Sequence, residues 1–329
     1  MRPLTRQTFR PQLAGIVFCA VYVTVLVASV IISAAVPQPA SQWCYAFVAP
    51  LLYIVAVVAG GLADGTDVVS ALGVRRAPRP WQAGLTVALA IACVVAFLPL
   101  ATGVQRLFDL MGYHATPSYA DYYSSWGNFA LGLVGLALLP ALGEEVLCRG
   151  MMFGALKGKG TVYGILLSAL LFALWHGSPV QLVHQFLIGV VMAVLVHFTR
   201  TVWTSVLFHF CNNALVIVYE FTYTQAGWSY TIDWWVYLLM FVCGTALVVA
   251  LLYVFVKGTV KRTPAGEGAL TFAGEPLGAK ERVRRAFDVH GEYVPSVRGN
   301  ARQMIAVYAT FGLVALLWLV NTISGWIEG

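Results

Sequence analysis

The chain has 329 residues, of which 60% are hydrophobic and only 10% are charged, and its formal net charge is +6. Because soluble globular proteins carry about 25% charged residues, this composition excludes a soluble globular domain. The mean hydropathy of +0.79 instead predicts a polytopic membrane protein. The sequence contains no nucleic-acid-binding motif. We therefore expect the lipid bilayer as a partner, and no nucleic acid.

Apolar runs of about 20 residues mark segments that can cross about 30 Å of hydrocarbon as helices. Nine such runs predict an all-α fold with about nine transmembrane helices around an intramembrane polar cavity. The runs cover residues 13–35, 43–63, 81–103, 128–157, 161–177, 181–199, 202–221, 233–256 and 303–324. The fourth run is the longest and contains Pro140, which we expect to kink the helix unless part of the run lies outside the hydrocarbon.

The distribution of basic residues predicts the topology. Alternating the nine spans assigns every loop to one of two faces of the membrane. Of the 20 Lys and Arg residues, Arg149 lies inside a span, Arg106 falls on one face and all the others fall on the opposite face. By the positive-inside rule that richly basic face is cytoplasmic, so the N-terminus is predicted to be cytoplasmic and the C-terminus external. The predominance of Arg over Lys points to a bacterial plasma membrane.

Three charged residues interrupt the fourth run: Glu144, Glu145 and Arg149. Each buried charge costs roughly 3 kcal/mol on insertion scales, so these residues need an explanation. Glu145 and Arg149 are four residues apart with the acid first, which is the favourable order for a helical ion pair. Such a pair can be purely structural. Glu144 points about 100° away from Glu145, needs another partner and is a candidate general base.

Two further polar pairs lie in nearby apolar runs. Phe172 and His176 are four residues apart and precede a predicted helix break at residues 177–179, where a histidine can reach water. His209 and Asn213 are also four apart, so both can face a developing oxyanion from one side of a helix. A single intramembrane histidine is more often a packing residue. The occurrence of both pairs together with the two glutamates favours a site.

These clusters match EExxxR at residues 144–149, FxxxH at 172–176 and HxxxN at 209–213. In this order they resemble the CAAX protease and bacteriocin-processing (CPBP, or Abi) family of intramembrane proteases, which is related to the Ras-converting enzyme. The resemblance implies an intramembrane endopeptidase that cleaves a membrane-associated peptide or protein. It divides the chain into N-terminal helices with an outer loop, a catalytic core, and a C-terminal part with a basic cytoplasmic loop: residues 1–127, 128–221 and 222–329.

The resemblance also implies roles for the motif residues. Glu144 and His176 would activate a water for attack on the peptide carbonyl, while His209 and Asn213 would stabilise the oxyanion. The other motif residues would support the site: Glu145, Arg149 and Phe172.

Metal dependence stays open at this point. We expect no cofactor, and the alternative is a zinc ion held by Glu144, His176 and His209 with one open position. The metal-free reading is preferred because Glu144 cannot easily be both a ligand and the base. The sequence also lacks HExxH, which would place two ligands on one helical face.

Simple helix counting places Glu144 and Asn213 near the middle of their spans but His176 near the outer end of a short one. His176 would then not reach Glu144 unless the fifth and sixth segments are tilted or re-entrant, or their boundaries differ by several residues. Two other classes of function remain: a proton-coupled transporter that uses the same residues, and a non-proteolytic membrane scaffold or immunity protein.

Overall fold

The computed structural model describes residues 8–113, 125–226, 232–262, 279–287 and 301–327. Within these ranges the chain is helical and forms no β-strand, which confirms the all-α prediction. The helices are α1 (Pro11–Ala35), α2 (Ala40–Asp64), α3 (Val68–Leu72), α4 (Pro80–Leu110), α5 (Trp126–Gly132), η2 (Leu133–Leu138), α6 (Leu139–Glu145), η3 (Val146–Phe153), α7 (Gly154–Leu156), η4 (Lys157–Lys159), α8 (Thr161–Trp175), α9 (Pro179–Thr199), α10 (Trp203–Ala226), α11 (Trp234–Arg262), α12 (Ala279–Ala286) and α13 (Ala301–Ile327).

Each of the nine predicted runs contains a helix, but only seven of these helices in the described ranges are long and apolar enough to cross a membrane. Helix α8 has 15 residues, about 23 Å, which is shorter than the ~30 Å of hydrocarbon. Helix α10 has 24 residues, but its polar side chains, among them His209, Asn213 and Glu220, lower its hydropathy. The count of nine spanning helices is therefore not confirmed, whereas a multi-pass membrane protein is.

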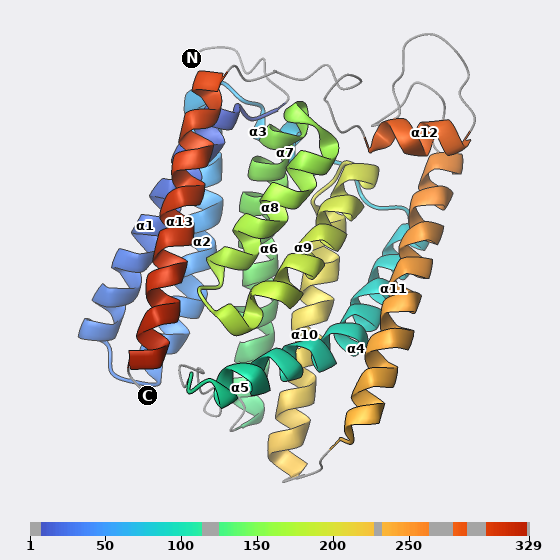
Figure 1. The fold of residues 1–329 in the computed structure, drawn as a ribbon. Helices are drawn as coiled ribbons and strands as arrows, with labels where there is room; N and C mark the ends of the chain where they lie inside the picture. Colours follow the sequence, from blue (N-terminus) through green and yellow to red (C-terminus); the bar gives the residue numbers. More distant parts are fainter. Residues whose placement is uncertain (1–7, 114–124, 227–231, 263–278, 288–300, 328–329) are drawn as a thin grey trace.

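The long helices form one bundle whose two chain ends lie at opposite ends of it (Figure 1). Helix α1 packs against α2 and α13, and α4 packs against α10 and α11. The α8–α9 hairpin lies between these two groups and contacts both, through α13 on one side and α4 and α10 on the other (Figure 1). The hairpin is therefore held by helices from both the first and the last parts of the chain.

The turn of this hairpin lies inside the bundle. Trp175, at the end of α8, packs edge-on against Phe18, Tyr22 and Tyr53, with ring centroids 5.1, 5.0 and 5.2 Å away. Tyr22 and Tyr53 lie near the midpoints of α1 and α2, so His176, the next residue, lies near the middle of the bundle. Figure 1 shows the turn above the lower end of α10. The expectation from helix counting is therefore wrong at His176, because α8 stops part-way through the bundle.

Candidate active site

The fourth helical segment is not a regular α-helix. The π-helical segments η2 and η3 flank the short helix α6, which ends at Glu145. Pro140 has no N–H, so it cannot donate a hydrogen bond to the carbonyl of Leu136 four residues earlier. The Nδ2 of Asn213, from α10, donates to that carbonyl at 3.1 Å. Pro140 itself lies in the α-helical turns of α6, between two π-helical segments of a kind that often occurs at functional sites.

Helix α6 approaches α2 very closely beside Glu144. A Cβ atom at Gly143 would lie 2.6 Å from the carbonyl oxygen of Pro50, so the two backbones meet here only because residue 143 is a glycine. Glu144 interacts electrostatically with Tyr45 and Tyr53 of α2. Its Oε2 is buried and has no hydrogen-bond partner in the part of the chain that the structure describes. The packing therefore places this carboxyl group against α2 without using it in an ion pair.

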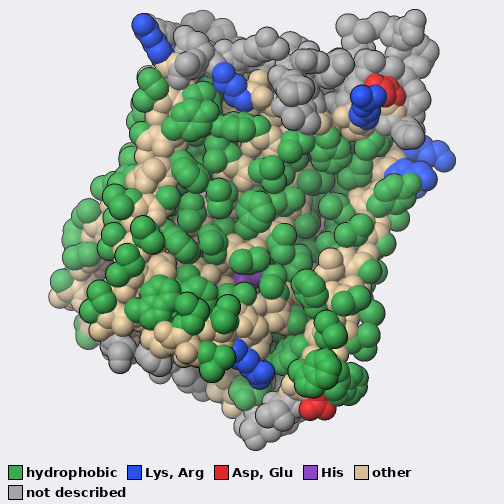
Figure 2. All heavy atoms as spheres, in the orientation of Figure 1, with side chains coloured by type: hydrophobic (Ala, Val, Ile, Leu, Met, Phe, Trp, Pro, Cys, Tyr) green, Lys and Arg blue, Asp and Glu red, His purple; other side chains and the backbone are tan. Residues whose placement is uncertain are grey.

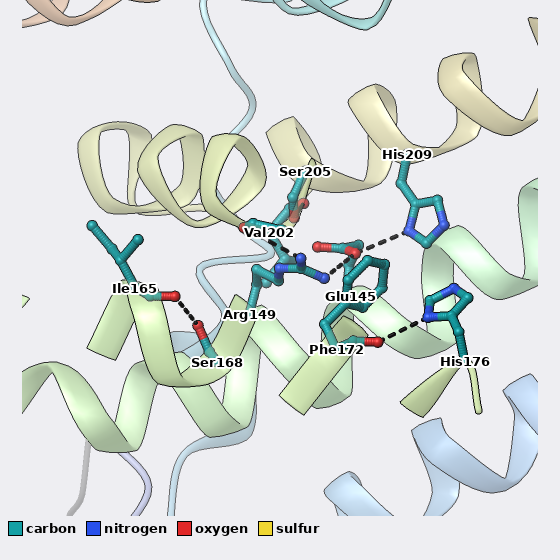
Figure 3. Close-up of polar contacts among 10 residues, drawn as sticks. Glu145, Arg149, Ile165, Ser168, Phe172, His176, Val202, Ser205 and His209 are labelled. Atoms are coloured by element: carbon teal, nitrogen blue, oxygen red, sulfur yellow. Dashed lines mark hydrogen bonds and ion pairs between the residues drawn. The ribbon is translucent and has the colours of Figure 1, made fainter. Parts of the chain in front are cut away.

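Glu145 is used quite differently. Its side chain is fully buried, and its Oε1 accepts hydrogen bonds from the Nη1 of Arg149 at 2.7 Å and from the Nδ1 of His209 at 2.9 Å (Figure 3). Arg149 is also buried, and its Nη2 donates to the carbonyl of Gly189 in α9 at 3.3 Å. The predicted ion pair between Glu145 and Arg149 is confirmed. It links the fourth segment to α9 and, through His209, to α10.

The ring of Phe172 joins the three motifs. The guanidinium carbon of Arg149 lies 4.1 Å from the centroid of this ring, which is a cation–π contact. The imidazoles of His176 and His209 meet it edge-on, with centroids 4.8 and 5.8 Å away. Phe172 is buried. It therefore fixes the relative positions of side chains from the fourth segment, α8 and α10.

Hydrogen bonding fixes the tautomer of both histidines. The Nδ1 of His176 lies 2.8 Å from the carbonyl oxygen of Phe172, and a carbonyl can only accept, so Nδ1 carries the proton and Nε2 of the neutral ring has a free lone pair. The Nδ1 of His209 likewise donates to the carboxylate of Glu145. The Nε2 of His209 can donate to an oxyanion only when the ring is an imidazolium. Glu145 and His209 therefore act together.

The structure brings the motif residues into one region but does not join all of them. Glu144 interacts electrostatically with His209, Glu145 and Arg149. No hydrogen bond or ion pair connects it to His176 among the residues described. Glu144 and His176 are each only partly buried, whereas Glu145, Arg149 and His209 are buried.

The alternative zinc ligands do not form a metal site. No group of three His, Cys, Asp or Glu side chains that could hold a metal ion occurs in the described ranges. Both histidines have committed Nδ1 to protein acceptors, which leaves only Nε2 of each for any other partner. A free Nε2 with Nδ1 bonded to an acceptor is also the arrangement of zinc-bound histidines, so it is the placement of Glu144, His176 and His209, and not their hydrogen bonding, that differs from a three-ligand zinc centre.

Three residues near the site were missed by the sequence analysis. Trp175 packs against Tyr53 and so sets the depth of His176, and Tyr53 interacts electrostatically with Glu144. Single aromatic residues in apolar helices gave no signal for either role in the sequence. Asn321 of α13 donates from Nδ2 to the carbonyl of Gly177 at 2.6 Å, and Gly177 has a positive φ of 66°. The sequence did offer a signal for Asn321, because a single amide side chain in an apolar helix tends to form a hydrogen bond to a neighbouring helix.

One comparison with known proteins identifies this region. The family model of the type II CAAX prenyl endopeptidase Rce1-like proteins matches residues 126–215, which contain all three motifs. No curated protein and no solved structure matches the chain. Residues 126–215 are therefore similar to the CAAX-type proteases of the CPBP family, and the seven apolar helices in the described ranges indicate an integral multi-pass membrane protein.

Proposed function

We propose that the protein is an intramembrane endopeptidase in which Glu144 and His176 activate the attacking water. The observation that carries this proposal is the unequal use of the two adjacent acids. The Oε1 of Glu145 accepts from both Arg149 and His209, whereas Glu144 forms no hydrogen bond or ion pair with the residues described; the Oε2 of each acid is buried there without a partner. An acid that is held in place but not neutralised by an ion pair can take a proton from water.

The reaction follows from these placements. The water oxygen attacks the carbonyl carbon of the peptide while its proton passes to Glu144. His176 orients this water through its unprotonated Nε2, because its Nδ1 is bonded to Phe172. The C–N bond then breaks, and the proton held by Glu144 passes to the leaving amine. The reaction consumes one water and one peptide bond, and Glu144 and His176 return to their starting protonation states.

The oxyanion would be stabilised by His209 and Asn213. The Nδ1 of His209 donates to the buried carboxylate of Glu145 at 2.9 Å, which orients the ring, and the Nε2–H of its imidazolium form is the group that would donate to the oxyanion. Asn213 has committed one amide hydrogen to Leu136, which orients the side chain and leaves its second hydrogen for the oxyanion. In this scheme Glu145 and Arg149 are positioning residues.

The substrate that we propose is a membrane-associated peptide or protein. The name of the matched family refers to CAAX prenyl endopeptidases, so a prenylated CaaX peptide and its unprenylated counterpart are the first pair to compare. In the described part of the chain, no contact specifically favours a transporter or a scaffold over a peptidase.

We expect cleavage to survive the removal of metal. Protein purified in chelator, and shown by elemental analysis to lack zinc, should cleave the same peptides at an unchanged rate, because Glu144 itself accepts the proton. If zinc is required, chelation should remove the activity and added zinc should restore it. Zinc that is stoichiometric and tracks activity across preparations would reassign Glu144 from base to ligand.

The proposed orientation has a cytoplasmic N-terminus and an external C-terminus. A reporter fused after Gly329 should read as external, and one inserted near Gly268 should read as cytoplasmic, because Lys and Arg concentrate on the inner face. Cysteine accessibility or a paired phosphatase and fluorescent-protein assay measures both positions. Reporters on the same side would remove α13 from the spanning helices.

Asn321 should act as a positioning residue for His176. Asn321→Leu removes the hydrogen bond to the turn that follows His176, and displacement of a reacting group by about 1 Å can lower the rate by 10²-fold. We expect kcat to fall at least about tenfold with little change in KM. Thr322→Val is the matched control, since the hydroxyl of Thr322 donates to the carbonyl of Trp318 within α13. An unchanged kcat in Asn321→Leu would contradict this role.

A further inference from the structure

A groove lies between α4 and α11 at the basic end of the bundle, away from the candidate active site. Its volume is about 480 Å³, and three cations from the last turns of α11 line it: Lys257, Lys261 and Arg262. None of the three forms a salt bridge within the described ranges. In Figure 2, Lys and Arg side chains gather at this end of α11. Within the part of the chain that the structure describes, the groove is therefore positively charged and has no counter-ion.

The rest of the lining is aromatic and aliphatic. The guanidinium carbon of Arg262 lies 4.6 Å from the ring centroid of Trp81, and the Nζ of Lys257 lies 5.3 Å from that of Tyr253. Aromatic rings of this kind mark the level of the lipid headgroups. Leu85 and Val254 line the groove one turn further toward the hydrocarbon. The groove thus changes from charged to apolar along the direction in which a phospholipid lies.

The carbonyl groups at the C-terminal end of α11, which would ordinarily repel an anion, are covered by arginine side chains. The free carbonyls of a helix C-terminus carry partial negative charge. Here the carbonyl of Arg262 accepts a hydrogen bond from the Nη1 of Arg79 at 3.1 Å, and the carbonyl of Val260 accepts one from Arg282 of α12. Two more guanidinium groups therefore cover the carbonyls beside the groove. A buried hydrogen bond between Gln82 and Thr259, 3.2 Å long, holds α4 and α11 together beneath it.

We infer that this groove binds an anionic glycerophospholipid, with its phosphate between Lys257 and Lys261 and its first acyl carbons along Leu85 and Val254. Cations that face the headgroup region each contribute about fivefold to the binding of an anionic lipid. The inference rests on the groove alone and is independent of the proposed peptidase activity.

The test compares two double variants that remove equal charge from the same face. Lys257→Gln with Lys261→Gln empties the groove of two exposed cations, whereas Arg75→Gln with Arg76→Gln removes two exposed cations outside it. Native mass spectrometry of the detergent-purified full chain measures how much phosphatidylglycerol and phosphatidylcholine each protein retains. Thermal unfolding in lipid-free detergent confirms that both variants are folded.

Wild type and the Arg75/Arg76 variant should both prefer phosphatidylglycerol, and the Lys257/Lys261 variant should lose that preference by on the order of 20-fold. Equal losses in the two variants would overturn the site, because the preference would then come from the general positive field. An unchanged preference in the Lys257/Lys261 variant would also overturn it. Stabilisation by inorganic phosphate as large as that by phosphatidylglycerol would show a site for free anions and contradict the lipid.

Discussion

Glu144→Gln should abolish detectable peptide cleavage and leave the protein folded, which is the largest effect expected from the proposed mechanism. The amide keeps the size and the hydrogen-bonding capacity of the side chain next to Tyr53, but it cannot take a proton from water. Loss of a general base lowers the rate by about 10²–10⁴-fold. Single-turnover cleavage of a membrane-tethered peptide measures the rate, and thermal unfolding in detergent measures the stability.

Glu220→Gln is the matched control for this substitution. Glu220 is a partly buried glutamate of α10 that no hydrogen bond or contact described above links to the site. We expect Glu220→Gln to leave the cleavage rate within about twofold of wild type. Substitutions outside the core, ion pairs and helix caps usually have small effects. Equal activity in wild type and Glu144→Gln would eliminate the proposed mechanism.

Glu145→Gln should instead lower the stability of the folded protein. The buried guanidinium of Arg149 would keep its contacts with Gly189 and Phe172 but lose its charge partner, and His209 would lose its acceptor. Breaking one side of a buried ion pair costs about 3–5 kcal/mol. The measurement is the free energy of unfolding, or the thermal midpoint, in a fixed detergent.

A double variant separates loss of the pair from loss of packing. Glu145→Gln combined with Arg149→Met removes both charges and should recover a large part of the lost stability, because replacing a whole buried pair with apolar groups is often neutral. Glu281→Gln, which breaks the exposed pair with Arg284 at 3.8 Å, should change stability by less than about 1 kcal/mol. A stable Glu145→Gln single variant would show that Arg149 does not depend on this carboxylate.

The sequence alone predicted the positions of the helices and the ion pair within one helix, because both depend on residues close together in the chain. Hydropathy over about 20 residues located a helix in each of the nine predicted runs, since a backbone in hydrocarbon has to satisfy its own hydrogen bonds. The spacing of four between Glu145 and Arg149 predicted their ion pair, because residues four apart share one face of a helix. The three motifs also predicted a cluster, and contacts among Glu145, Phe172 and His209 bring residues of all three together.

Only the tertiary structure decided the depth of each helix and the partner of each polar group. Helix α8 has the composition of a spanning helix, yet it stops near the level of Tyr53, where Trp175 packs. The bonds from His209 to Glu145 and from Asn321 to Gly177 join residues 64 and 144 positions apart. Local hydropathy is the same whether such contacts form or not. They arise when helices pack, because a buried donor in an apolar bundle binds whichever acceptor the packing brings to it.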